Sequence, residues 1–111
     1  MGKTGENLAC RFLEKRGFEI VERNYRTRTG EIDIIARHCE VIVFIEVKTR
    51  ATLNFGLPEE AVDIRKQEQI RNTAFEYMYK KNFMVNPIRF DVISIFKKDG
   101  KWQLRWFKQA F

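Results

Sequence analysis

The sequence has few of the residues that bind transition metals or form covalent cross-links. Its 111 residues include 2 cysteines and 1 histidine. Cys10 falls in an expected helix and Cys39 in an expected turn, and neither has a partner at the spacing of a zinc site. We therefore expect two free thiols, and we interpret His38 as a solvated turn residue rather than a metal ligand.

Long apolar runs are absent as well. No stretch reaches the length that spans a membrane, and residues 1–12 lack the apolar region of a signal peptide. We therefore expect a cytoplasmic protein with no membrane partner. The chain also has only 2 prolines and no segment that indicates a disordered linker. A chain of 111 residues can bury one core but not two, so we expect a single domain over residues 1–111.

Negative charge is in the minority. The chain has 21 lysines and arginines against 15 aspartates and glutamates, a formal net charge of +6. An excess of positive charge favours polyanions such as nucleic acid or an anionic membrane face, although it does not specify a fold. The charge is therefore only supporting evidence for a nucleic-acid partner.

Hydrophobic periodicity predicts two helices and five strands. The helices are expected at residues 4–16, capped by Gly17, and at about 63–81, with Asp63 as the N-cap. The strands are expected at residues 18–26, 31–37, 40–48, 88–96 and 102–107. The fold class that we expect is α/β, with a central mixed five-stranded sheet flanked by helices in the order α-β-β-β-α-β-β.

The second and third expected strands carry charges among apolar residues. Asp33 interrupts the second strand, and Glu46 and Lys48 interrupt the third. Side chains alternate along a strand, so Glu46 and Lys48 share a face with Ile42 and Phe44, and the opposite face is apolar. The third strand is therefore expected to be central and covered on both sides.

A short turn joins these two strands and allows two registers. In one register Asp33 faces Phe44 and lies diagonal to Glu46, and in the other it faces Glu46 directly. In both registers the two carboxylates share a face, roughly 5 to 8 Å apart. Carboxylates this close disfavour double ionisation unless a cation lies between them. Lys48 is one such cation, and Mg²⁺, which prefers oxygen ligands, is another.

The three charged residues supply the groups that phosphodiester hydrolysis needs. A metal ion neutralises charge in the transition state and lowers the pKa of a bound water, and a lysine orients that water and contacts the phosphate. The alternative is a buried salt bridge, in which Lys48 pairs with Asp33 or Glu46 and holds the sheet together. Apolar residues often replace such pairs without loss of stability, which favours a functional role.

The same residues resemble a known nuclease motif. Asp33, twelve further residues and then Glu46-x-Lys48 are similar to the core of the restriction-endonuclease-like, or PD-(D/E)xK, nucleases, which include archaeal Holliday junction resolvases. Many of these nucleases have proline before the first acidic residue, where this chain has Ile32. More closely, ordered segments over nearly the whole chain resemble the YraN family of small bacterial proteins: GKTGENLACRFLEKRGFEIVERNYRTRTGEIDIIA, VIVFIEVKTR, FGLPEEAV, RKQ and RFDV.

This resemblance implies a restriction-endonuclease-like fold and a Mg²⁺- or Mn²⁺-dependent nuclease that acts on DNA, including branched or junction DNA. It implies that Asp33 and Glu46 are metal ligands, Lys48 the catalytic lysine and Glu6 a further acidic residue of the site. Gln67 is a further catalytic candidate, because a helix-borne glutamine lies near the metal in relatives of this fold. The position of Glu6 at the edge of its helix's apolar arc is compatible with that role, as it is with a first-turn glutamate favoured by the helix dipole.

Basic residues flank the acidic site in the sequence and are candidates for contacts to a nucleic-acid backbone. The candidates are Arg26, Arg28, Arg50 and Lys66. Trp102 and Trp106 share a face of the last strand, where core packing or a dimer edge is expected rather than base stacking. A homodimer is a possible assembly, since two symmetric cuts would need one.

Two other functions stay open. The chain could be a catalytically silent nucleic-acid-binding protein that keeps the nuclease fold and the basic surface. It could also be a non-enzymatic interaction protein whose acidic cluster is structural. A nuclease would cleave nucleic acid, and a silent binding protein would bind it without cleavage. An interaction protein would show no nucleic-acid binding at low salt.

Overall fold

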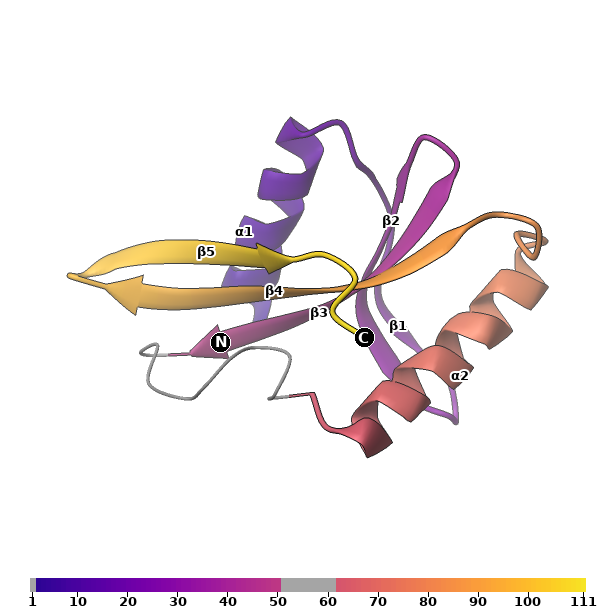
Figure 1. The fold of residues 1–111 in the computed structure, drawn as a ribbon. Coiled ribbons are helices and arrows are strands. Elements are labelled where there is room, and N and C mark those ends of the chain that lie inside the picture. The colour runs from indigo at the N-terminus through magenta and orange to yellow at the C-terminus, as the bar shows by residue number, and fades with distance from the viewer. Residues whose placement is uncertain (1, 51–61) are drawn as a thin grey trace.

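The computed structural model describes residues 2–50 and 62–111, with side chains from residue 4 onward. In these ranges the chain forms α1 (Gly2–Lys15), β1 (Glu19–Arg26), β2 (Glu31–His38), β3 (Val41–Arg50), α2 (Ile64–Lys80), β4 (Ile88–Lys98) and β5 (Lys101–Phe107), as Figure 1 shows. The elements match the expected segments to within about two residues at each end. The quoted segment FGLPEEAV lies outside the described residues except for its last residue, Val62.

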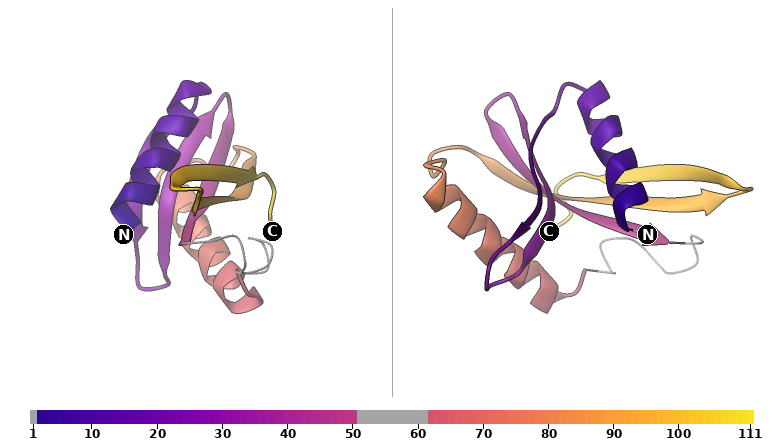
Figure 2. Two further views of the ribbon diagram at one scale, coloured as in Figure 1. Left: turned by 90° about the vertical axis from the view of Figure 1, so that its left-hand side faces the viewer. Right: turned by 180° about the vertical axis from the view of Figure 1, so that it is seen from behind.

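The five strands form one mixed sheet in the order β1-β2-β3-β4-β5. β3 and β4 are parallel and are connected through α2, whereas the other neighbouring pairs are antiparallel. α1 packs against one face of the sheet and α2 against the other, and Figure 2 shows the two helices on opposite sides. The expected α/β class with a mixed five-stranded sheet flanked by helices is confirmed.

β3 is covered on both faces, as its apolar composition predicts. Val43 belongs to the core beneath α1, and Ile42 and Phe44 belong to the core beneath α2. All three side chains are almost completely buried. Glu46 and Lys48 continue the row of Ile42 and Phe44, so their charges emerge on the α2 side of the sheet.

Both helices have the caps that the sequence predicts. After α1, Gly17 has a φ of 87°, and the backbone N–H of Phe18 donates to the Leu13 carbonyl at 3.1 Å. Before α2, the Asp63 side chain accepts a hydrogen bond of 2.8 Å from the backbone N–H of Lys66. In the described part of the chain, neither helix is long and apolar enough to cross a membrane.

Candidate active site

The sheet splits where the acidic residues lie. The β2–β3 ladder ends at the pair Ile34 and Ile45, so Asp33 and Glu46 take the next opposed positions of the second expected register. Beyond this point β2 continues beside β1, and β3 continues beside β4. Figure 1 shows β3 and β4 leaving the β1–β2 hairpin at this point.

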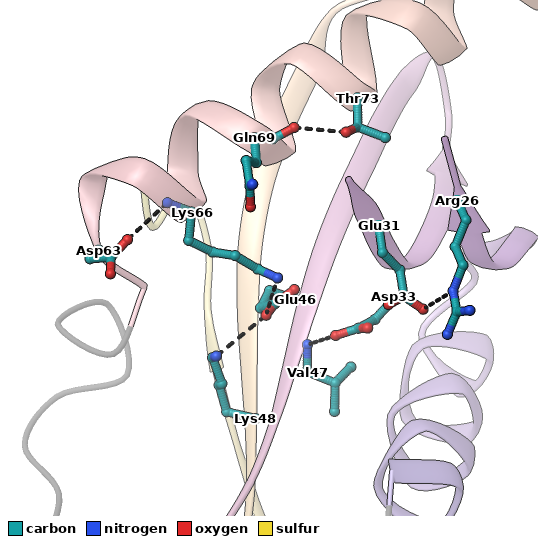
Figure 3. A network of polar contacts seen from close by, with 10 residues as sticks. All are labelled: Arg26, Glu31, Asp33, Glu46, Val47, Lys48, Asp63, Lys66, Gln69 and Thr73. Carbon is teal, nitrogen blue, oxygen red and sulfur yellow. Dashed lines mark hydrogen bonds and ion pairs between the residues drawn. The ribbon is translucent and has the colours of Figure 1, made fainter. Parts of the chain in front are cut away.

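The Asp33 side chain supplies a hydrogen-bond acceptor at the point where the β2–β3 pairing ends. Its Oδ2 atom accepts a hydrogen bond of 2.8 Å from the backbone N–H of Val47, as Figure 3 shows. Burial, followed by the neighbouring Glu46 carboxylate, raises the pKa of Asp33 to about 7, although the Val47 hydrogen bond opposes this shift and Glu6 adds to it. Asp33 therefore lies in a partly dehydrated and electronegative position, where a proton or a cation is favoured.

Two lysines approach the Glu46 carboxylate, which is 7% exposed. Lys48 Nζ lies 3.4 Å and Lys66 Nζ 3.9 Å from Glu46 Oε2, and Figure 3 shows the two side chains converging on it. Lys48 comes from the same face of β3, and Lys66 comes from the first turn of α2. The structure thus places Lys66, predicted as a contact to the nucleic-acid backbone, at the acidic pair itself.

Glu6 approaches the acidic pair from α1. Its carboxylate accepts a hydrogen bond of 3.1 Å from Asn24 Nδ2 and forms an ion pair of 3.4 Å with Arg23. Glu6 is nevertheless close enough to raise the pKa of Asp33. β1 residues therefore hold Glu6 at the edge of the site, and the split in the sheet lets a residue on the α1 side act on Asp33.

Gln67 is oriented differently from Lys66. Its side-chain Nε2 donates a hydrogen bond of 2.8 Å to the backbone carbonyl of Val62. This bond stabilises the chain just before α2. Within the described residues, Lys66 therefore reaches Glu46 from this helix turn, and Gln67 is engaged at the helix start.

The remaining basic candidates lie around the split. Arg26 is exposed at the end of β1 and forms an ion pair of 3.2 Å with Glu31 at the start of β2. Arg28 is exposed in the following turn, and Arg50 is half-buried at the end of β3. These positions place positive charge on the β1–β2 turn and on the strand that carries Glu46.

The pair Asp33 and Glu46 could share a hard divalent cation. In residues 2–50 and 62–111, no group of three or more His, Cys, Asp or Glu side chains is gathered as a self-contained metal site. Mg²⁺ does not require such a group, because it is commonly held by one or two carboxylates, with water or phosphate at its other positions. The oxygen donors therefore fit Mg²⁺ or Mn²⁺.

Asp91, in the segment RFDV, has a role that the sequence pattern does not reveal. The side chain is fully buried on β4 and accepts hydrogen bonds of 2.9 Å from both Nε and Nη2 of Arg89. It also accepts from Trp106 Nε1 at 2.8 Å and from the backbone N–H of Gln109 at 3.0 Å. This network ties the chain after β5 to the strand that supports β3. Its only signal in the sequence is an aspartate within an apolar run.

Comparisons with known proteins give a consistent result. A family model described as "Uncharacterised protein family UPF0102" matches residues 5–95. The chain is 50% identical over 102 residues to a UPF0102 protein of Dictyoglomus thermophilum, covering 91% of this chain and 86% of that protein. It is 42% identical over 111 residues to a UPF0102 protein of Syntrophomonas wolfei, covering 100% of this chain and 96% of that protein.

Proposed function

The chain belongs to the UPF0102 family, the YraN family that its segments resemble, and from the geometry of its site we propose that it is a divalent-metal-dependent nuclease that hydrolyses phosphodiester bonds of DNA. One observation carries the proposal. Asp33 and Glu46 meet where β2 and β3 separate, and two lysines lie against Glu46. An acidic pair with adjacent ammonium groups suits the transfer of a phosphate better than it suits a stable core.

Each residue of the site would have a separate role in the proposed hydrolysis. Asp33 and Glu46 would hold Mg²⁺ or Mn²⁺. When bound, such an ion neutralises charge on the phosphate and lowers the pKa of a coordinated water. The Val47 N–H holds the Asp33 carboxylate in place. The Lys48 ammonium group would orient the attacking water and favour its ionisation through its positive charge, and Lys66 stabilises negative charge on the phosphate oxygens.

The choice of DNA as the proposed substrate is supported by the order of the helices and strands and by the positive charge of nearby arginines. The element order α-β-β-β-α-β-β and the Asp33, Glu46-x-Lys48 spacing support a restriction-endonuclease-like fold, similar to that of archaeal Holliday junction resolvases. Arg26 and Arg28 provide positive charge for a DNA backbone beside the split. Branched or junction DNA is included in the proposal, and two symmetric cuts in it would require a homodimer.

The direct test is cleavage by purified protein of duplex and four-way-junction DNA with Mg²⁺, with Mn²⁺ or with EDTA. We expect metal-dependent cleavage that falls at least about 100-fold in each of Asp33→Asn, Glu46→Gln and Lys48→Gln. Glu40→Gln is the matched control, because Glu40 is an exposed carboxylate in the β2–β3 turn. Cleavage that persists unchanged in the three site variants would come from a contaminant and would overturn the proposal.

One observation favours a second function. The Glu46 charge is already compensated by Lys48 and Lys66 without a metal ion, as in a structural ion cluster. A catalytically silent nucleic-acid-binding protein would show salt-sensitive binding and no cleavage with any metal. Absence of nucleic-acid binding at low salt would instead support an interaction protein.

A further inference from the structure

A groove lies between α1 and the β4–β5 hairpin, away from the α2 side on which Glu46 emerges. Its volume is about 370 Å³. Phe12 of α1, Ile95 of β4 and Leu104 of β5 give it an apolar lining. Figure 2 shows α1 lying across the sheet beside this hairpin. We call this feature the α1 groove.

Positive charge surrounds the α1 groove. Arg11 and Lys15 of α1 line it from exposed positions, as does Arg16 directly after the helix. Lys97 of β4 adds a fourth cation, with its Nζ 5.1 Å from the centroid of the Trp102 ring. Of the described residues that line the groove, none is acidic. The groove is therefore complementary to a polyanion.

The two tryptophans of β5 have different environments. Trp106 packs edge-on against Phe12 and Phe18, with ring centroids 5.6 and 5.4 Å apart, so it is partly buried against the core beneath α1, the first of its two expected roles. Trp102 is 39% exposed and lines the α1 groove. An exposed indole beside several cations is the arrangement on which unpaired bases stack, whereas the bases of a duplex stack on one another.

The helix α1 contributes both to the α1 groove and to the edge of the candidate active site. Glu6 of α1 lies at the edge of the acidic pair. Arg11 follows Glu6 by five residues, which is about 8 Å along a helix. The groove opens on the α1 face of the sheet, whereas Glu46 emerges on the α2 face, so a strand bound in the groove would pass around the sheet to reach the acidic pair.

We propose that the α1 groove binds an unpaired segment of a nucleic-acid strand, with a base stacked on Trp102 and phosphates contacting Arg11, Lys15 and Arg16. This inference rests on the proposed function and deepens it. It specifies a substrate that has a single-stranded segment in addition to the cleaved bond, such as a flap, a gap or the open end of a branch.

The test is binding without cleavage, measured in EDTA by fluorescence anisotropy with a labelled oligothymidylate of about 12 nucleotides and a duplex of equal length. Trp102→Ala should lower single-strand affinity about tenfold with an unchanged salt slope, and Trp102→Tyr should restore it. Arg11→Gln/Lys15→Gln should lower the slope of log K against log salt by about 1.4, because each phosphate contact to a single strand contributes about 0.7.

Matched controls come from the exposed end of α2. Tyr79→Ala removes an aromatic ring and Lys80→Gln/Lys81→Gln removes two charges, and both should leave oligonucleotide binding unchanged. Single-strand affinity that is unaltered in Trp102→Ala, or that falls equally for the duplex, would overturn the inference. The same holds if the groove variants lose binding only to vesicles of phosphatidylserine and phosphatidylcholine, or only to an acidic peptide.

The inference and the proposed function can fail separately. Asp33→Asn should lose cleavage and keep single-strand binding. If the wild-type protein cleaves DNA and the groove variants bind like wild type, only the inference fails. If the groove variants lose binding but no metal supports cleavage by the wild-type protein, the proposed function fails and the inference holds.

Discussion

The backbone N–H of Val47 donates a hydrogen bond of 2.8 Å to the Asp33 carboxylate, just beyond the last β2–β3 pair. A strand amide at this point has lost its partner on the neighbouring strand, and a part-buried amide without an acceptor is costly. The Asp33 side chain supplies that acceptor. Asp33 therefore supports the split in the sheet and also forms the acidic pair with Glu46.

The raised pKa of Asp33 predicts a specific pH dependence of stability in metal-free protein. The pKa is about 7 in the folded state, against an ordinary value of 3.8. Below about pH 4, Asp33 is protonated in both states and its contribution to stability is fully present. Between about pH 4 and 7 the unfolded chain releases the proton first, so the free energy of unfolding falls, and this loss is complete above about pH 7.

The variant Asp33→Asn should lack this part of the pH dependence. One pKa unit corresponds to about 1.4 kcal/mol, so its stability relative to wild type should rise by on the order of 2 kcal/mol between pH 4.5 and 7.5. Urea denaturation in EDTA measures this difference. The exposed variant Glu40→Gln should follow wild type, and parallel curves for Asp33→Asn and wild type would contradict the assigned environment.

Metal binding should stabilise the folded protein. A ligand at about tenfold above its Kd adds about 1.4 kcal/mol, which raises the Tm of a domain of this size by several degrees. Thermal unfolding with Mn²⁺ or Mg²⁺ should show this rise in wild type and in Lys48→Gln, but not in Asp33→Asn or Glu46→Gln. An equal rise in all four proteins would place the ion elsewhere.

The fold is largely predictable because its signals are local. Periodicities of helix and strand are read within each segment, and continuous burial on both faces identifies β3 as a central strand. The hairpin register is not predictable in this way. Cys39 in the turn has a φ of 56°, which cysteine rarely adopts, and no glycine or asparagine marks the position.

The sequence predicts only the part of the site that is formed by two strands adjacent in the chain. Alternation and a short turn are enough to place Asp33 and Glu46 on one face. The choice of Lys66 over Gln67 depends on how α2 lies across the sheet, because adjacent helical residues point about 100° apart. The Asp91 network draws on separate segments of the chain, so no local pattern indicates it.

Asp91 should be far more important for stability than a carboxylate in a surface ion pair. Asp91→Ala leaves the Arg89 guanidinium, with a side chain only 20% exposed, without its carboxylate, which should cost about 3–5 kcal/mol. Glu31→Ala removes the partner of exposed Arg26 and should cost at most about 1 kcal/mol. Urea denaturation at pH 7 compares the two. Similar losses would mean that the buried network contributes no more than a surface ion pair.

The approach of α1 to β3 depends on the absence of a side chain at Gly5. A Cβ at this position would collide with Thr49 Oγ1 and would lie 3.5 Å from Thr49 Cβ. Gly5→Ala should therefore destabilise the protein by about 1–3 kcal/mol, despite the better helix propensity of alanine. In Gly5→Ala/Thr49→Ala the hydroxyl is gone and only an ordinary contact remains, so stability should return to near that of wild type.

A double-mutant cycle measures this relationship by urea denaturation. The coupling energy between the two substitutions should be about 2 kcal/mol, because each change alters the space available to the other. Glu6 follows Gly5 directly, so Gly5→Ala should also move Glu6 away from Asp33 and shrink the pH dependence described above. Additive effects on stability would mean that the Thr49 side chain does not limit the space for a methyl group at position 5.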